Sequence, residues 1–321
     1  MTASVQPPSF TIPPRAPAQP TAPRWPLWGV YVAAVLSGSA IAVWRLGPAI
    51  REAPTLAAVG VVAFGVFGLV CAWLLSRINY FRRPAPTTAA LAVLWGGCAA
   101  IGYALLANIA IHDHFAAQGR PGSWSLFAPL TEEPAKNIGI VIVLLLAATQ
   151  PRSALDGLVA GSFVGLGFEV VESHTRAVNN AIEFYPAGQR DDLGSLAADV
   201  IHEVVRNSWT GHIVLTGIAG FGIGYLLRAR DRSAARRWAV AVALVLVAAA
   251  GHLLWNSHRF GLFYALGQFG FLGLFLWLIR IGRSLEAQVY LPYLAYTRIP
   301  VDPATTSRVS RRDDRARRRA S

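Results

Sequence analysis

Long apolar segments recur along this chain and restrict what it can fold into. A window of about 20 residues, the length of helix that crosses the hydrocarbon core of a bilayer, finds such segments over most of the sequence. They lie near residues 27–46, 55–76, 86–111, 127–148, 155–176, 205–227, 238–257 and 262–281. Hydrophobic residues make up 54% of the chain and charged residues 14%, which is too apolar for a soluble domain of this length. The predicted fold is all-α: a polytopic transmembrane helix bundle of about eight spans.

Arginine predicts the orientation of this bundle. Of the 29 basic residues only Lys136 is a lysine, and the arginines concentrate in short loops and in the C-terminal tail. If the spans alternate, the loops "RINYFRRP" and "RARDRSAARR", Arg152 and the tail all lie on one side, which the positive-inside rule assigns to the cytoplasm. We therefore expect a multi-pass protein of the cell membrane with both termini cytoplasmic and with residues 177–204 as an outer loop.

The net charge of +12 raises nucleic-acid binding as a function class. The arginines lie between apolar segments, which is typical of topology signals, so no nucleic-acid partner is expected. Anionic lipid is the expected partner of the Arg-rich tail. Composition divides the chain into a disordered Pro-rich cytoplasmic tail over residues 1–26, a transmembrane bundle over 27–283 and a cytoplasmic Arg-rich tail over 284–321.

Two carboxylates and the single lysine lie inside the fourth span. The segment "PLTEEPAKN" contains Glu132, Glu133 and Lys136, and residues 138–148 alone would cover only about 16 Å of helix, roughly half the bilayer core. A helix start, with Thr131 as N-cap, is one interpretation of the acidic pair. It leaves unexplained Lys136, a cation one turn from Glu132. Ionisable groups within a span are functional by default, so we expect a site here.

The fifth span carries a second acidic motif. In "GLGFEVVES", Glu172 follows Phe168 by one helical turn, and Glu169 lies on much the same face. Gly165 and Gly167 allow a neighbouring helix to approach closely. The glycines alone indicate helix packing. The carboxylates of Glu172 and Glu169 add a second feature, and one of them is a candidate partner of Arg176 or Lys136.

Two histidines lie in later spans, His212 in "RNSWTGHIVLTGIAG" and His252, one turn before Asn256, in "GHLLWN". Counted from the outer ends of their spans at about 1.5 Å per residue, Glu132, Glu172, His212 and His252 all fall roughly 6–10 Å below the outer surface. A lone histidine in a helix is commonly a hydrogen-bonded core residue. Four helices that offer carboxylates, imidazoles and an amide at one depth instead indicate a site.

These motifs resemble those of PrsW-type membrane proteases. "EEPAK" is similar to the EExxK motif of that family, "FEVVE" to its FxxxE motif, and His212 and "HLLWN" to its histidine motifs. The family is grouped with CAAX prenyl proteases, bacteriocin-processing proteases and the Aph-type subunit of gamma-secretase. The resemblance covers about residues 127–256, with the four motifs in order. Glu169 and Ser173 depart from the pattern, which has a small or apolar residue and an asparagine there.

The resemblance implies that residues 27–283 form a protease-like bundle, a membrane-embedded glutamic-type endopeptidase. Known members cut membrane-tethered anti-sigma factors from the extracytoplasmic side. Hydrolysis inside a membrane requires a base to activate scarce water, and a buried carboxylate can serve. Glu132 is the first candidate for this base, with Glu133 sharing its proton and Lys136 holding the pair. In the rest of the expected catalytic set, His252 and Asn256 stabilise the oxyanion, His212 assists the water or the leaving amine, and Glu172 orients a histidine.

This mechanism needs no cofactor. Zinc is the alternative, held by Glu132, Glu172, His212 and His252 and activating the water, although the sequence contains no HExxH. Two further alternatives are a non-catalytic scaffold, like the Aph-type relatives, and a transporter with a proton or ion relay, against which the absence of an evident repeat counts. The expected partners are a membrane-tethered protein substrate and the lipid bilayer.

Overall fold

Helices make up the regular structure of the chain. The computed structural model describes residues 24–81, 83–120, 125–147, 153–184, 211–257 and 262–297, together with a few residues between 194 and 204. Within these residues no strand occurs, which confirms the all-α prediction. In chain order the helices are α1 (Trp25–Glu52), α2 (Pro54–Leu75), α3 (Pro86–Leu94), the π-helix η1 (Trp95–Ala100), α4 (Ile101–Ala117), α5 (Ala128–Leu146), α6 (Ala154–Phe184), α8 (His212–Arg228), α9 (Ala234–Asn256) and α10 (Leu262–Thr297).

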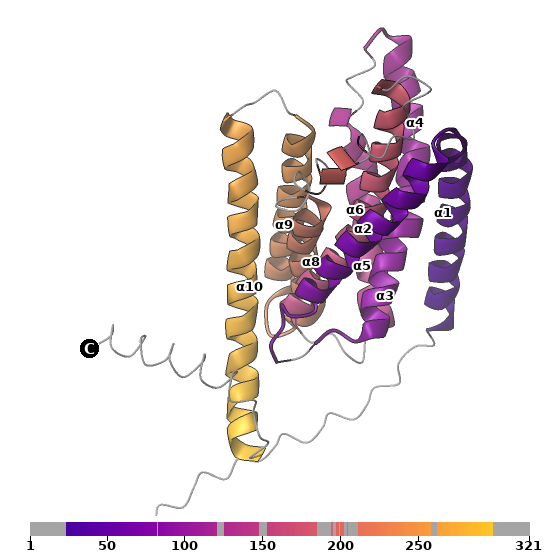
Figure 1. Cartoon of the computed structure of the whole chain (residues 1–321). Coiled ribbons are helices and arrows are strands. Elements are labelled where there is room, and N and C mark those ends of the chain that lie inside the picture. The colour runs from indigo at the N-terminus through magenta and orange to yellow at the C-terminus, as the bar shows by residue number, and fades with distance from the viewer. Residues whose placement is uncertain are drawn as a thin grey trace, which may run out of the picture.

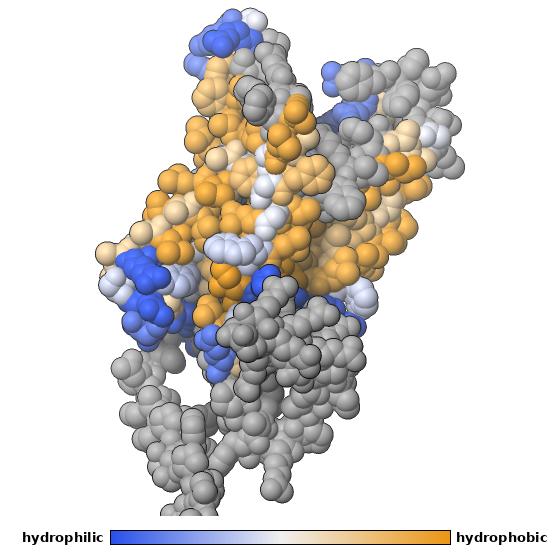
Figure 2. Space-filling view, turned by 90° about the vertical axis from the view of Figure 1, so that its left-hand side faces the viewer, coloured by the Kyte–Doolittle hydropathy of each residue, from blue (hydrophilic) through white to orange (hydrophobic). Residues whose placement is uncertain are grey.

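Six helical segments of the described chain are long and apolar enough to cross a membrane, namely α1, α2, the continuous run Pro86–Ala117, α6, α9 and α10. The other two segments, α5 and α8, also lie at predicted spans. The α5 sequence contains Glu132, Glu133 and Lys136, and α8 has only 17 residues. The eight segments together agree with the predicted polytopic bundle. Figure 2 shows apolar side chains covering the middle of one face, with hydrophilic ones gathered toward its ends.

Some predictions concern residues that the structure does not describe. Residues 1–23, 298–321 and most of 185–210 lie outside the described part, so the two tails and the outer loop stay predictions. Four helices extend past their predicted spans: α1 continues to Glu52, α4 to Ala117, α6 to Phe184 and α10 to Thr297. No proline lies near the predicted ends of α6 and α10, and α10 continues through Gly282.

The α6 helix occupies the centre of the bundle, between α2 and α3 on one side and α8 on the other (Figure 1). Its most apolar stretch is 83% buried, against 17% for α1 and α2. Gly157, Gly161 and Gly165 recur every four residues along its α8 side. A Cβ added at any of the three would lie 2.3 Å from a carbonyl oxygen of α8. Only glycine permits this backbone contact, and at Gly165 the oxygen belongs to His212.

Two helix starts differ from the sequence interpretation. The α5 helix begins at Ala128, with Pro129 in its first turn, so Thr131 lies inside the helix and the prediction of Thr131 as N-cap is wrong. Its hydroxyl instead donates to Asn108 Oδ1 of α4 at 2.5 Å. The α8 helix begins at His212 and not near residue 205, because Gly211 is extended. His212 therefore lies in the first turn of its helix.

Arginine side chains bond backbone carbonyls at one end of the bundle. This end, where Arg228 and Arg283 make such bonds, is called the arginine-rich end below. Arg228 Nη2 donates to Leu144 O at 3.3 Å, which joins the ends of α8 and α5. Arg283 Nε of α10 donates to Ile78 O after α2 at 2.6 Å. The loops that carry most of the arginines thus share one end of the molecule, as the alternation of spans predicts.

Candidate active site

The acidic pair of α5 is buried around the chain's single lysine. Glu132, Glu133 and Lys136 are 4%, 3% and 0% exposed. Lys136 Nζ lies 2.6 Å from Glu133 Oε1 and 3.8 Å from Glu132 Oε2, because residues three and four positions apart share a helix face. The ammonium also lies 4.6 Å from the centroid of the Phe168 ring on α6. One cation thus partly compensates two carboxylates in an apolar surrounding.

His252 of α9 binds the same acidic pair from the opposite side. Its Nδ1 lies 2.7 Å from Glu133 Oε1, and its Nε2 lies 3.6 Å from Glu132 Oε2. Glu133 Oε1 consequently accepts from both Lys136 and His252. The imidazole is 2% exposed, so α9 presents it to α5 and not to lipid.

His212 joins the lysine to the second acidic motif. Lys136 Nζ donates to His212 Nδ1 at 2.9 Å, which leaves the ring proton on Nε2, where Glu172 Oε2 accepts it at 2.7 Å. Glu172 also forms a 2.7 Å ion pair with Arg176 one turn along α6. Glu172 is thus in contact with a histidine, and its predicted role of orienting that histidine for catalysis stays a prediction.

Aromatic and imidazole rings enclose this group of residues. The centroids of His212 and His252 lie 4.8 Å apart in an edge-to-face arrangement, and Phe168 packs at 4.7 Å against His212. The Phe168 side chain is fully buried. Helices α5, α6, α8 and α9 therefore bring six predicted residues into one site, called the Glu–His cluster below: Glu132, Glu133, Lys136, Glu172, His212 and His252.

Asn256, the seventh predicted residue, has a different contact. It lies at the last position of α9, and its Nδ2 donates to Ser125 O at 2.7 Å. This bond fixes the end of α9 to the segment that leads into α5, on which Glu132 and Glu133 lie. The predicted role of Asn256 as an oxyanion donor stays a prediction.

Asn108 of α4 belongs to the site, and the sequence interpretation missed it. Its Nδ2 donates to Glu132 Oε1 at 3.0 Å, and its Oδ1 accepts from Thr131. The available signal was weak: one amide in the apolar run "LLANIAIH". The bond holds one Glu132 oxygen in place. The other, Oε2, is buried and makes no hydrogen bond in the structure.

Glu169 also acts in a way that the sequence did not show. Its Oε2 accepts the backbone N–H of His212 at 2.8 Å, and its Oε1 accepts from the Ser173 hydroxyl at 3.1 Å. The first N–H groups of a helix lack intrahelical partners, so a carboxylate of α6 caps the start of α8. The two departures from the family pattern thus form one buried unit at the backbone of His212.

The donor set of the cluster fits a divalent cation. Glu132, His212 and His252 each offer one ligand atom, and these atoms lie within 4.8 Å of one another. One carboxylate and two imidazoles are ordinary zinc ligands, and Glu132 Oε2 is a buried oxygen without a hydrogen bond. Glu133 would support His252 as a ligand through Nδ1. His212 would have to release Lys136 or Glu172, because both of its ring nitrogens are bonded.

Comparison with known proteins agrees with this geometry. The model of a family described as "PrsW family intramembrane metalloprotease" matches residues 84–281, a range that contains the whole Glu–His cluster, Asn108 and Glu169. Among curated proteins and among solved structures, none matches the chain. Because the matched range covers more than half of the sequence, the chain belongs to the PrsW family of intramembrane proteases.

Proposed function

We propose that this protein hydrolyses a peptide bond of a membrane-tethered protein, such as an anti-sigma factor, near the extracytoplasmic face. The observation that carries the proposal is the buried Glu–His cluster, in which three carboxylates, two imidazoles and one ammonium are joined by direct contacts. Burying so many ionisable groups costs free energy that apolar residues would avoid. Family membership supplies the reaction class.

Glu132 is the proposed general base. Each of the two acidic residues buries one Oε2 that has no hydrogen bond among the described residues, and the two differ at Oε1. Glu133 Oε1 accepts from Lys136 and His252, whereas Glu132 Oε1 accepts from the neutral Asn108. An open, buried carboxylate oxygen can accept a proton from water. Asn108 fixes the other oxygen of Glu132, so the carboxylate keeps one orientation. Glu133 and Lys136 then act as the support of His252 and His212.

The histidines supply the remaining proposed roles. His252 lies beside Glu132, where its Nε2 can donate to the oxyanion of a tetrahedral intermediate when the ring is an imidazolium, since Nδ1 already donates to Glu133. His212 assists the water or the leaving amine, a role in which it would release Lys136 or Glu172, because both of its ring nitrogens are bonded. Asn256 is proposed as a further oxyanion donor from its place one turn after His252. In this form the enzyme is a glutamic-type endopeptidase without a cofactor.

A metal-dependent reaction is the second candidate, because the family description names a metalloprotease and the ligand atoms of Glu132, His212 and His252 lie close together. Zinc held there would supply a Lewis acid that activates water. Glu133 would orient His252, and whichever of Glu172 and Lys136 stays bonded to His212 would position it.

Cleavage of a membrane-tethered substrate by the purified protein tests both candidates. The glutamic mechanism predicts that Glu132→Gln lowers the rate by roughly 10²- to 10⁴-fold at unchanged folding, and that a chelator has no effect. Loss of activity with the chelator, restored by zinc, would establish the metal-dependent reaction instead. Glu183→Gln, an exposed position of the central α6 helix, is the matched control and should cleave like the parent. Cleavage by Glu132→Gln and Glu133→Gln at the parental rate would overturn both mechanisms, because Glu132 is the proposed base in one and a zinc ligand in the other. Absence of cleavage by the parent would leave the scaffold.

A further inference from the structure

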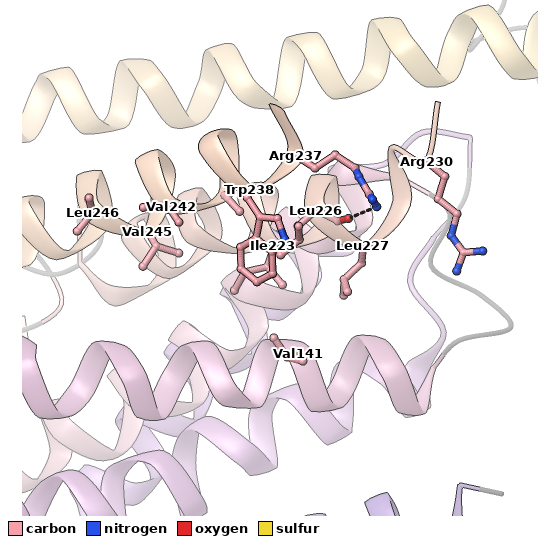
Figure 3. Close-up of a pocket in the computed structure, with 11 residues that line it drawn as sticks. Val141, Ile223, Leu226, Leu227, Arg230, Arg237, Trp238, Val242, Val245 and Leu246 are labelled. Carbon is pink, nitrogen blue, oxygen red and sulfur yellow. Dashed lines mark hydrogen bonds between the residues drawn. The ribbon is translucent and has the colours of Figure 1, made fainter. Parts of the chain in front are cut away.

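An apolar groove lies on the outside of the bundle, away from the Glu–His cluster. Val141 of α5 forms one wall, the last two turns of α8 form its floor, and α9 forms the other wall (Figure 3). Its cavity volume is about 620 Å³, within the roughly 300–1,000 Å³ typical of small-molecule sites. Trp238, Val242 and Leu246 on its α9 wall are 59%, 49% and 62% exposed. These side chains face the hydrocarbon if the bundle lies in a bilayer.

The length of the groove corresponds to one leaflet. Its α9 wall runs from Arg237 to Leu246, about 14 Å of helix. Half the hydrocarbon core of a bilayer is about 15 Å thick. One end of the groove lies at the arginine-rich end of the bundle, so the other end reaches approximately the level of the bilayer midplane.

The only charged residues among those that line the groove are two arginines at one end (Figure 3). Arg237 Nη1 donates to Leu226 O at 3.1 Å, which holds the guanidinium at the mouth of the groove. Its Nε is buried and makes no hydrogen bond in the structure. Arg230 is exposed beside it, and the adjacent Trp238 has the ring type that gathers at headgroup level. Basic pockets between membrane helices are sites for anionic lipid headgroups.

A substrate helix fits the groove less well than a lipid does. A transmembrane helix about 10 Å wide and 30 Å long displaces roughly 2,400 Å³, several times the groove volume. Membrane helices also commonly carry Lys or Arg at their cytoplasmic ends, which Arg230 and Arg237 would repel. A phospholipid instead matches the groove in three respects. Its length is that of one leaflet, its volume is closer to that of the groove, and an anionic headgroup is opposite in charge to Arg230 and Arg237.

We propose that this groove binds one anionic phospholipid, with an acyl chain against Val141, Val242 and Leu246 and the phosphate at Arg230 and Arg237. The site is separate from the tail at residues 284–321, for which anionic lipid was expected from sequence. It does not depend on the reaction that the Glu–His cluster performs.

Native mass spectrometry of the detergent-purified full chain tests the proposal with two probes of identical acyl chains, palmitoyl-oleoyl phosphatidylglycerol and palmitoyl-oleoyl phosphatidylcholine. The parent should retain one phosphatidylglycerol in clear preference to phosphatidylcholine. Each arginine replaced by glutamine should weaken phosphatidylglycerol binding about fivefold, so R230Q with R237Q should lose about 25-fold and the preference with it. Arg230 is exposed, so R230Q alone keeps the test valid if R237Q disturbs the α8–α9 loop.

Arg83→Gln is the matched control, because Arg83 is exposed in the arginine-bearing loop between α2 and α3, outside the groove. It should bind like the parent. Equal binding of the two lipids by the parent, or an equal loss in R83Q and R230Q, would overturn the proposal. A photo-crosslinking residue at position 242 should give a lipid adduct in membranes, whereas a protein adduct as the main product would show that the groove takes a helix.

Discussion

Lys136 is the residue on which the geometry of the cluster depends most. Its Nζ bonds Glu133 at 2.6 Å and His212 at 2.9 Å, so it links the acidic pair of α5 to the first turn of α8. The side chain is fully buried, and Phe168 closes one side of it. A compact ammonium with three donors can serve both partners from this position, whereas a planar guanidinium is larger and has a fixed fork geometry.

Lys136→Arg should therefore impair activity while expression stays near normal. Every other basic residue of the chain is arginine, so the swap retains the charge and tests only shape. Overpacking a closed site costs about 1–3 kcal/mol and displaces the partners of the added atoms. The measurement is substrate cleavage at matched protein levels, with Lys136→Met as the variant that removes the charge. Full activity of the arginine variant would show that any cation suffices.

Glu169 acts through His212 and is a positioning residue. Both of its oxygens accept hydrogen bonds, from the His212 N–H and from Ser173. Glu169→Gln can satisfy the same two groups, since its amide offers an acceptor and a donor, and it should keep most of the activity. Glu169→Ala leaves a buried N–H unpaired, at about 1–3 kcal/mol, and should lower kcat more than it raises KM. Equal loss in the two variants would mean that the charge itself is required.

At the scale of elements, the contact between α6 and α8 determines where His212 lies. The glycines of α6 let the two backbones touch, and the closest of these contacts to the site places Gly165 against the His212 carbonyl. Glu172, which holds the ring, and Glu169, which holds the backbone, follow on the same helix within two turns. The α6 helix thus both packs against α8 and positions its histidine.

Gly165→Ala should separate these helices and reduce both stability and activity. The added Cβ would lie 2.3 Å from the His212 carbonyl oxygen, closer than side chains approach, so one helix must move. We expect a destabilisation of about 1–3 kcal/mol in thermal unfolding and a larger loss of cleavage than of folded protein. Gly65→Ala in α2 is the control, because a Cβ there meets nothing within 4 Å, and it should resemble the parent. Parental activity of Gly165→Ala would contradict this account of the site.

The positions of the helices could be predicted from sequence because hydropathy is local to each segment. The place of Thr131 inside α5 and the start of α8 could not, since each depends on partners distant in sequence. Thr131 bonds an amide of α4, and a carboxylate of α6 caps α8 at His212.

The residue types of the site were visible as charges in apolar spans, as with Glu132. Their pairing was not, because which histidine meets which carboxylate depends on helix packing, and Asn108 is a single amide in an apolar helix.

At the scale of the whole molecule, the cluster and the arginine-rich end lie toward opposite ends of the bundle. Glu132 is in the second turn of α5 and His212 in the first turn of α8, whereas the C-terminal ends of both helices meet at the arginine-rich end. If that end faces the cytoplasm, as the positive-inside rule predicts, the cluster lies in the outer part of the membrane. Water and an extracytoplasmic substrate segment would then reach it from outside.

Reporter fusions test this orientation. Eight crossings return the chain to its starting side, so both termini should lie in the cytoplasm. A fluorescent protein that is active only in the cytoplasm should therefore be fluorescent when it is fused to either terminus. Alkaline phosphatase inserted between residues 184 and 211 should be active, because the start of α8 at His212 lies at the end of the helix opposite Arg228 and the arginine-rich end. Replacing the exposed Arg230, Arg232 and Arg236 by glutamine should weaken this orientation preference, and it leaves the contacts that Arg228 and Arg237 make with Leu144 and Leu226 in place. If the insertion and the C-terminus reported the same side, the cluster would lack access from outside, and the substrate segment would have to be sought in the cytoplasm.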